Sequence, residues 1–436
     1  MLSSNCFRLS FLFALVTAVA PAVAAEPDDI GTRPASGHAP LVQARDTADE
    51  DAPEPHADVP DGEAVTTQGR GYDEVDVVPP AHLIATDPPG DWAVAHAGFR
   101  PHLDTFGGLL TFALAHARTE RFYGVVSIAT VRNDAGTHVG AAQFALGRNL
   151  SDEFIGVSQV SLAENRARTF IGLGQVTIGY NRAHEHYGLF QFAGYNATDE
   201  AGVLTQLGGY NRASDRFAGG FMAGVMNQAE NDFAGIAQLG VINAQGPLLP
   251  FGEGSTNDGT AFRGVAQAGF YNSAADFQGV VQAGAFSGAE TFRGAFQIGG
   301  VIAGAEDFAG VAQLGALTLH EEGAGSQLGA VNVSTDAFAG LQLGGVGNFG
   351  DDVDGVQLAG LANIAGDMSG LQVGLVNYAE SVEGVQIGLY NHANRLRGLQ
   401  IGLVNHAPDG LLPWSALINM GFDDSGFYDG EVMARR

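Results

Sequence analysis

The sequence predicts an all-β fold, a parallel two-sided β-solenoid of about 20 short coils with 14–16 residues each. The first observation is a glutamine that returns at this spacing through most of the chain, and repetition at a fixed short period is typical of repeat architectures. The second is the alternation of apolar residues with other residues inside each repeat, which is the period of a β-strand with one apolar face. Together they indicate one flattened coil per repeat, with each coil hydrogen-bonded to the next.

The recurring glutamines define the repeat. Stacked side-chain amides can donate to and accept from the coils on either side, so we expect a structural ladder on an outer face of the coil. The same column continues backwards to Thr111 and forwards to Trp414, with one long insertion at residues 246–260. The glutamines assigned to the ladder are Gln267, Gln282, Gln297, Gln313, Gln327, Gln342, Gln357, Gln372, Gln386 and Gln400.

The segment GVQIGLYN, residues 384–391, shows how one repeat is expected to fold. Val385, Ile387 and Leu389 alternate with the other residues and are predicted to point into the coil. Glycine and asparagine tolerate the positive φ that corners need, so Gly384 begins the strand at one corner and the asparagines mark the other. The corner asparagines of the best-defined repeats are Asn377, Asn391 and Asn405.

An up-and-down β-barrel of the outer membrane is the alternative fold, because alternation over about ten residues is also its signal. Consecutive turns of such a barrel lie at opposite ends of the wall and normally differ in length and chemistry. Here the successive turns NRASDRFAG, NQAENDFAG and NSAADFQG resemble one another. The turns therefore favour the solenoid.

Four regions are expected along the chain. Residues 1–25 have the layout of a secretory signal peptide, with an apolar run followed by small residues. Residues 26–91 are acidic and rich in Pro and Ala, and they have too few apolar residues to form a core, which predicts a disordered linker. Residues 92–410 form the repeat β-domain, and residues 411–436 a C-terminal cap and tail. We expect export to the periplasm, outer membrane or cell surface of a Gram-negative-type bacterium.

Composition limits the classes of partner. The chain carries 48 acidic and 20 basic residues, a formal net charge of −28, which disfavours binding to nucleic acid. No stretch approaches the roughly 20 apolar residues of a membrane helix, so no transmembrane helix is expected. The only cysteine, Cys6, falls in the predicted signal peptide, so the exported chain would have no disulfide or thiol chemistry.

The search for chemistry finds no catalytic constellation and no cofactor motif. His184 and His186 flank Glu185 and are the metal-ligand candidates, but they lack a third ligand nearby in the sequence. The acidic segments at 350–355 and 421–430 match no known calcium-binding motif. The sequence thus favours a non-enzymatic surface or interaction scaffold over a pore or anchor in the outer membrane and over a carbohydrate-active solenoid. Exposed aromatic rows can mark partner surfaces, and they can equally stack on one another to protect the sheet. The candidate contact row for a protein or glycan comprises Tyr180, Tyr195, Tyr210, Tyr271 and Tyr390.

The phrases GLQIGLVNHA, GLQVGLVNYA and GVQIGLYNHA, with the closing GLLPWSALINMGF, resemble a known family. They are similar to the repeats G-[LV]-Q-[IVL]-G-L-x-N of the leptospiral-type surface-repeat proteins, which are exported bacterial proteins. The resemblance is sharpest over residues 354–422. It implies export and surface exposure, and it supplies no activity, cofactor or catalytic residue.

Overall fold

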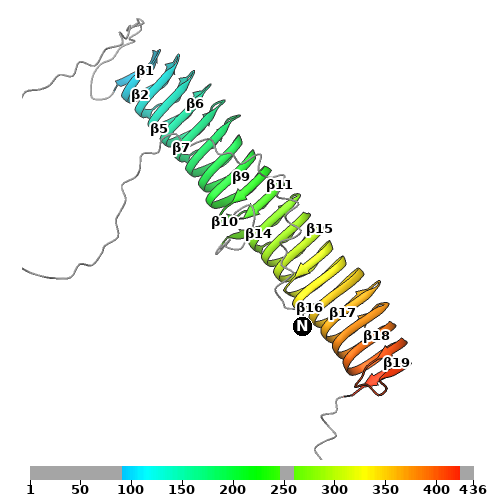
Figure 1. Ribbon diagram of the computed structural model, residues 1–436. Helices are drawn as coiled ribbons and strands as arrows, with labels where there is room; N and C mark the ends of the chain where they lie inside the picture. The colour runs from blue at the N-terminus through cyan, green and yellow to red at the C-terminus, as the bar shows by residue number, and fades with distance from the viewer. Residues whose placement is uncertain (1–90, 246–259, 423–436) are drawn as a thin grey trace, which may run out of the picture. The chain divides into compact units, whose positions relative to one another are not determined.

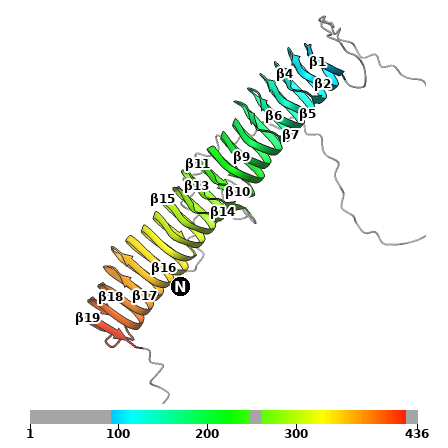
Figure 2. The ribbon, with the colours of Figure 1, turned by 180° about the vertical axis from the view of Figure 1, so that it is seen from behind.

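The computed structural model describes residues 91–245 and 260–422. Within these ranges the chain forms 19 β-strands and no helix. The coils stack along one axis from β1 to β19, as Figure 1 shows from one side and Figure 2 from the other. The predicted signal peptide, nearly all of the predicted linker, almost all of the insertion and the end of the tail lie outside the described residues.

The strand bounds show that many strands continue around the corners of the coil, since β9 alone covers 50 residues. The bounds are β1 Asp91–Gly98, β2 His102–Ala113, β3 His116–Tyr123, β4 Val126–Ala129, β5 Arg132–Ala145, β6 Arg148–Val160, β7 Glu164–Ile171, β8 Gly174–Val176, β9 Tyr180–Ala229, β10 Asp232–Ala234, β11 Ala237–Gln245, β12 Ala261–Arg263, β13 Ala266–Ala268, β14 Tyr271–Gln278, β15 Val281–His320, β16 Glu322–Ala359, β17 Ala362–Val373, β18 Val376–His406 and β19 Trp414–Gly421.

Successive coils pair in parallel and in register. In the pairing of β17 with β18, Gln372 lies opposite Gln386 and Gly370 lies opposite Gly384. The fold is a parallel β-solenoid of about 18 turns. Parallel pairing confirms the predicted fold class and excludes the up-and-down alternative, whose neighbouring strands are antiparallel. The described residues contain no helix long and apolar enough to cross a membrane.

The predicted inner and outer faces of the strand at residues 384–391 are reversed in the structure. Gln386 and Asn391 are completely buried, whereas Ile387 is 38% and Leu389 is 52% exposed. Alternation defines two faces of a strand but does not say which one points inward. The inward amides are stable because they satisfy one another, and the apolar part of the core comes from the other side of the coil.

The glutamine ladder therefore runs through the interior of the coil. The Nε2 of Gln400 donates to the Oε1 of Gln386 at 2.8 Å, and the Nε2 of Gln386 donates to the Oε1 of Gln372 at 2.8 Å. The same bond repeats back to Gln143, except where Met222 takes the ladder position and receives a 3.7 Å contact from Gln238. Each rung donates towards the N-terminal end of the solenoid.

The asparagines form a second buried ladder. The Nδ2 of Asn391 donates to the Oδ1 of Asn405 at 2.8 Å and to the backbone oxygen of Ile401 at 3.0 Å. Asn377 makes the same pair of bonds to the next coil. They do not have the positive φ expected for corner residues, because Leu417 is the only non-glycine residue with positive φ in the described chain. The asparagines donate towards the C-terminal end, opposite to the glutamines.

A column of stacked aromatic rings fills the other side of the coil. Phe262, Phe277 and Phe292 are fully buried, and their ring centroids lie 4.9 Å apart with nearly parallel planes. This spacing is close to the distance between hydrogen-bonded strands. Towards the C-terminal end the column changes to aliphatic residues, which are Val353, Met368, Val382 and Leu396.

Glycine is required at one corner of the C-terminal coils. Gly384 has a φ of 147° and Gly398 a φ of 146°, as the sequence predicted for a corner at Gly384. A Cβ atom on Gly384 would lie 2.0 Å from the backbone oxygen of Gly370 in the previous coil. Both the dihedral angle and the close approach of the two backbones therefore exclude a side chain.

The last coil is closed by β19, which pairs with β18 in the antiparallel direction. Trp414, predicted as the last rung, is instead the first residue of this strand. The Nδ2 of Asn419 donates to the Oε1 of Gln400 at 3.5 Å, so the final acceptor of the glutamine ladder has a partner. The cap thereby satisfies both the backbone edge and the side-chain ladder.

We predict that Gln386→Ala destabilises the solenoid by about 2–5 kcal/mol, because it leaves the Gln400 donor and the Gln372 acceptor without their ladder partners in the interior. The matched control Leu389→Ala changes an exposed side chain and should cost about 1 kcal/mol or less. Urea unfolding followed by circular dichroism measures both. A larger loss for Leu389→Ala than for Gln386→Ala would contradict the observed orientation.

We also predict that Gly384→Ala lowers the unfolding temperature far more than Gly345→Ala. Gly345 has no positive φ, and a Cβ atom there would meet its nearest neighbour at an ordinary 3.7 Å. Differential scanning calorimetry of the two variants tests this. Equal shifts would show that the corner tolerates a side chain.

Candidate functional site

The two outer faces of the solenoid differ sharply in chemistry. We call one of them the apolar face. In each coil it is formed by the outward side chains of a seven-residue segment, which begins two residues before the ladder glutamine and ends four residues after it. In the coil of Gln386 it comprises Val385, Ile387, Leu389 and the edge residue Tyr390. The opposite face follows the asparagine, and we call it the charged face.

The apolar face carries no charged residue. In each described coil from Leu109 to Val404, this segment lacks Asp, Glu and Arg. Large aliphatic side chains project from it into solvent along the whole stack, for example Val157, Val265, Val311 and Leu403, which are 44–62% exposed. Most exposed apolar residues of a soluble protein are scattered, whereas these form one continuous surface.

The ionic groups lie on the charged face, where some of them join neighbouring coils. Arg397 contacts Glu383 at 2.8 Å, and Arg212 contacts Glu230 at 2.7 Å. These side chains are at least partly exposed, so each pair contributes on the order of 0–1 kcal/mol. The pairs therefore matter more for solubility and for keeping charge on one side than for stability.

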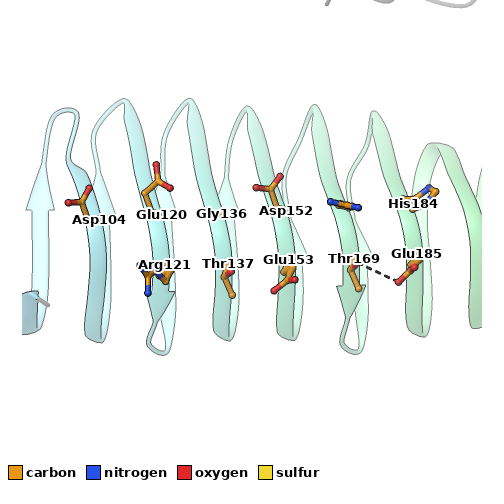
Figure 3. Close-up of a pocket in the computed structure, with 11 residues that line it drawn as sticks. Asp104, Glu120, Arg121, Gly136, Thr137, Asp152, Glu153, Thr169, His184 and Glu185 are labelled. Carbon is orange, nitrogen blue, oxygen red and sulfur yellow. Dashed lines mark hydrogen bonds between the residues drawn. The ribbon is translucent and has the colours of Figure 1, made fainter. Parts of the chain in front are cut away.

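The charged face also contains a shallow groove of about 870 Å³ over the N-terminal coils. Figure 3 shows its side chains as two rows along the stack. One row includes Asp104, Glu120 and His184, and the other includes Glu153 and Glu185, whose Oε2 accepts a 3.5 Å hydrogen bond from Thr169. In the described residues, no group of three or more His, Cys, Asp or Glu side chains could hold a metal ion.

The two metal-ligand candidates are not brought together. The chain turns a corner between them, so His184 is exposed on the charged face beside Asp199, whereas His186 is completely buried. His186 stacks on Phe170 with the ring centroids 4.5 Å apart. The expectation that both rings point to one side of a strand is therefore wrong, because the alternation of exposed and buried side chains is interrupted at this corner within β9.

The tyrosines of the predicted contact row lie near the edge between the two faces, and they do not form one exposed row. Tyr180 and Tyr195 stack at 4.8 Å, and Tyr195 meets Tyr210 edge to face at 4.8 Å. These three and Tyr390 are partly buried. Tyr271 is buried, which raises the pKa of its hydroxyl to about 12. The prediction that Tyr271 belongs to an exposed interaction surface is therefore wrong.

Three histidines occupy the interior. His138 and His186 take phenylalanine positions in the ring column, and burial lowers the pKa of each to about 3. His320 joins the column less regularly, and burial lowers its pKa to about 4. The spacing of 16 residues from Phe122 and Phe154 to His138 was the sequence signal that could have placed His138 inside.

At the C-terminal end, a surface stack of rings crosses the last coils. His392 lies 4.6 Å from Tyr378 and 4.8 Å from His406, which stacks on Trp414 at 3.9 Å, all between ring centroids. The Nδ1 atoms of His392 and His406 are 2.8 Å apart and share one hydrogen bond, so one of them carries the proton. The stack joins the cap strand to the last three coils.

The apolar face is the functional feature that sequence reasoning missed. Its aliphatic residues were assigned to the core, so the predicted contact surface was limited to the tyrosines. The available signal was the absence of charge from the whole segment between glycine and asparagine, together with a separate Phe and Ala column able to form the core. No family model, curated protein or solved structure matches the chain, so its function is argued from these surfaces.

We predict that His186→Phe stabilises the protein, and that the gain grows as the pH falls from about 6.5 towards 3. The unfolded histidine binds a proton in this window, whereas the buried ring with its pKa of about 3 does not, so the wild-type protein loses stability as the pH falls. Phenylalanine also removes two ring nitrogens that have no hydrogen-bond partner within the described residues.

Thermal unfolding measured between pH 7 and pH 4 tests this prediction. His184→Gln is the control, because that ring is exposed on the charged face. A constant difference between His186→Phe and wild type across this range would contradict the expected linkage.

Proposed function

We propose that this chain is an exported, non-enzymatic scaffold that holds other surfaces through its apolar face. The observation that carries the proposal is the continuous, charge-free row of exposed aliphatic side chains from Leu109 to Val404. A cell-envelope or surface location agrees with the predicted signal peptide.

The size of the apolar face supports a contact role. About 18 turns spaced about 4.8 Å apart, with a strand about five residues long in each, give an area of roughly 1,500 Å². The largest apolar patch on a typical monomeric protein is about 300–600 Å², and larger ones mark sites of interaction. Burying such a face also contributes about 25 cal/mol per Å², which is a strong driving force.

The interior supports the same role by fixing the face in place. Each apolar-face segment is hydrogen-bonded to both neighbouring coils through its backbone and through the inward glutamine beneath it. Satisfied buried hydrogen-bond networks rigidify the structures that contain them. Little conformational entropy would then be lost when a partner covers the face.

A fractionation experiment with paired variants tests the proposal. The full chain is expressed in a Gram-negative host, and the fraction bound to the cell envelope is compared with the free fraction. The apolar-face variant carries Leu361→Gln, Leu375→Gln, Leu389→Gln and Leu403→Gln, because stacked glutamines add polarity without the repulsion of stacked carboxylates. The control, on the charged face, carries Asp367→Asn, Glu380→Gln, Glu383→Gln and Arg397→Gln.

We expect the apolar-face variant to shift from the envelope-bound to the free fraction, while the control fractionates as wild type. Circular dichroism and thermal unfolding must show that both variants remain folded. A folded apolar-face variant that stays bound as wild type does would overturn the proposal.

A further inference from the structure

We infer that the partner of the apolar face is a second copy of this chain, packed face to face in an antiparallel two-fold dimer. This inference rests on the proposed function and adds the identity of the partner. It follows from the geometry of the face, from its area and from the distribution of charge.

The geometry of the face fits an identical face. Its aliphatic side chains form ridges at the coil spacing, and each coil repeats the pattern of the last. Two sheets pack by interdigitating such side chains at a distance of about 10 Å. The ridges of two partners match along a long interface only when their spacing is the same. A second copy of this chain has that spacing.

The area is sufficient for a stable dimer. The face offers roughly 1,500 Å² per chain, and a stable interface buries about 1,200–2,000 Å² in total over both partners. Pairing along half of the solenoid would already reach that range. Homodimer interfaces are also the most apolar class of interface, which agrees with a face that contains no charged residue.

The distribution of charge favours a second copy over a lipid surface. Pairing apolar faces leaves both charged faces outward in water, so the ion pairs such as Arg397 with Glu383 stay solvated. Binding to a bilayer is usually strengthened by basic residues and by interfacial tryptophan. The apolar face has neither from Leu109 to Val404, and the chain as a whole has a net charge of −28.

The charge of the described coils sets the direction. A two-fold axis in the plane of the interface either runs along the solenoid, which places like ends together, or crosses it, which makes the two chains antiparallel. Residues 91–245 carry 10 Arg and 13 acidic residues, whereas residues 260–422 carry 4 Arg and 14 acidic residues. Parallel chains would place the two more acidic halves side by side. The antiparallel arrangement separates them, and full overlap places the middle coil, around Gln267, on the axis.

The first test is the mass of the exported chain, residues 26–436, in analytical ultracentrifugation. We expect twice the mass of one chain at micromolar concentration. The four-site apolar-face variant Leu361→Gln, Leu375→Gln, Leu389→Gln and Leu403→Gln should raise the dissociation constant at least about 100-fold, while the charged-face control changes it little. A monomer, or a dimer equally stable in both variants, would overturn the inference.

The second test is site-directed crosslinking with a short bismaleimide. The exported chain lacks Cys6, so a single introduced cysteine reports one contact. Val265→Cys, on the middle coil and 51% exposed, should crosslink to its own copy, whereas Leu389→Cys, 52% exposed and far from the axis, should not. Crosslinking of both variants would overturn the antiparallel arrangement.

Flotation with phosphatidylcholine vesicles tests whether the apolar face binds lipid instead of a second copy of the chain. We expect the chain to stay at the bottom of the density gradient, since its face is covered in the dimer. Flotation of a monomeric wild-type chain, lost in the apolar-face variant, would show a lipid partner and would overturn the second copy while leaving the proposed scaffold function intact.

Discussion

The structure depends on the hydrogen bond between side-chain amides of successive coils. An amide buried alone would cost several kcal/mol, but a column of amides spaced by the distance between strands satisfies itself from coil to coil. Gln386 illustrates this, since it accepts from Gln400 and donates to Gln372 inside the coil. The repeat is conserved along the chain because each rung needs the ones above and below it.

The outer surface follows from this choice of interior. Glutamine and asparagine occupy inward positions that alternate with Val385, Ile387 and Leu389, so the aliphatic residues must face outward. Charges are excluded from that face and gathered on the other. A large exposed apolar face does not stabilise a monomer in water, and such faces mark sites of interaction with a partner.

The two ladders also oppose each other in direction. The glutamines donate towards the N-terminal end and the asparagines towards the C-terminal end, so their aligned amide dipoles act in opposite directions. The ladder itself provides no donor to the last glutamine, Gln400, and Asn419 of the antiparallel strand β19 supplies one. Antiparallel pairing with β19 also covers the last parallel edge, which limits end-to-end addition of further chains.

The sequence by itself determined the coil. The period of 14–16 residues, the alternation within it and the glycine at the corner define a parallel solenoid, because a coil can stack on the next only if equivalent residues recur in register. Only the tertiary structure decided which side of the strand is the interior. A period of two is the same for both faces, and the usual preference for buried aliphatic residues was outweighed here by amides that pair between coils. The separation of His184 from His186 was likewise decided by a corner that local spacing does not reveal.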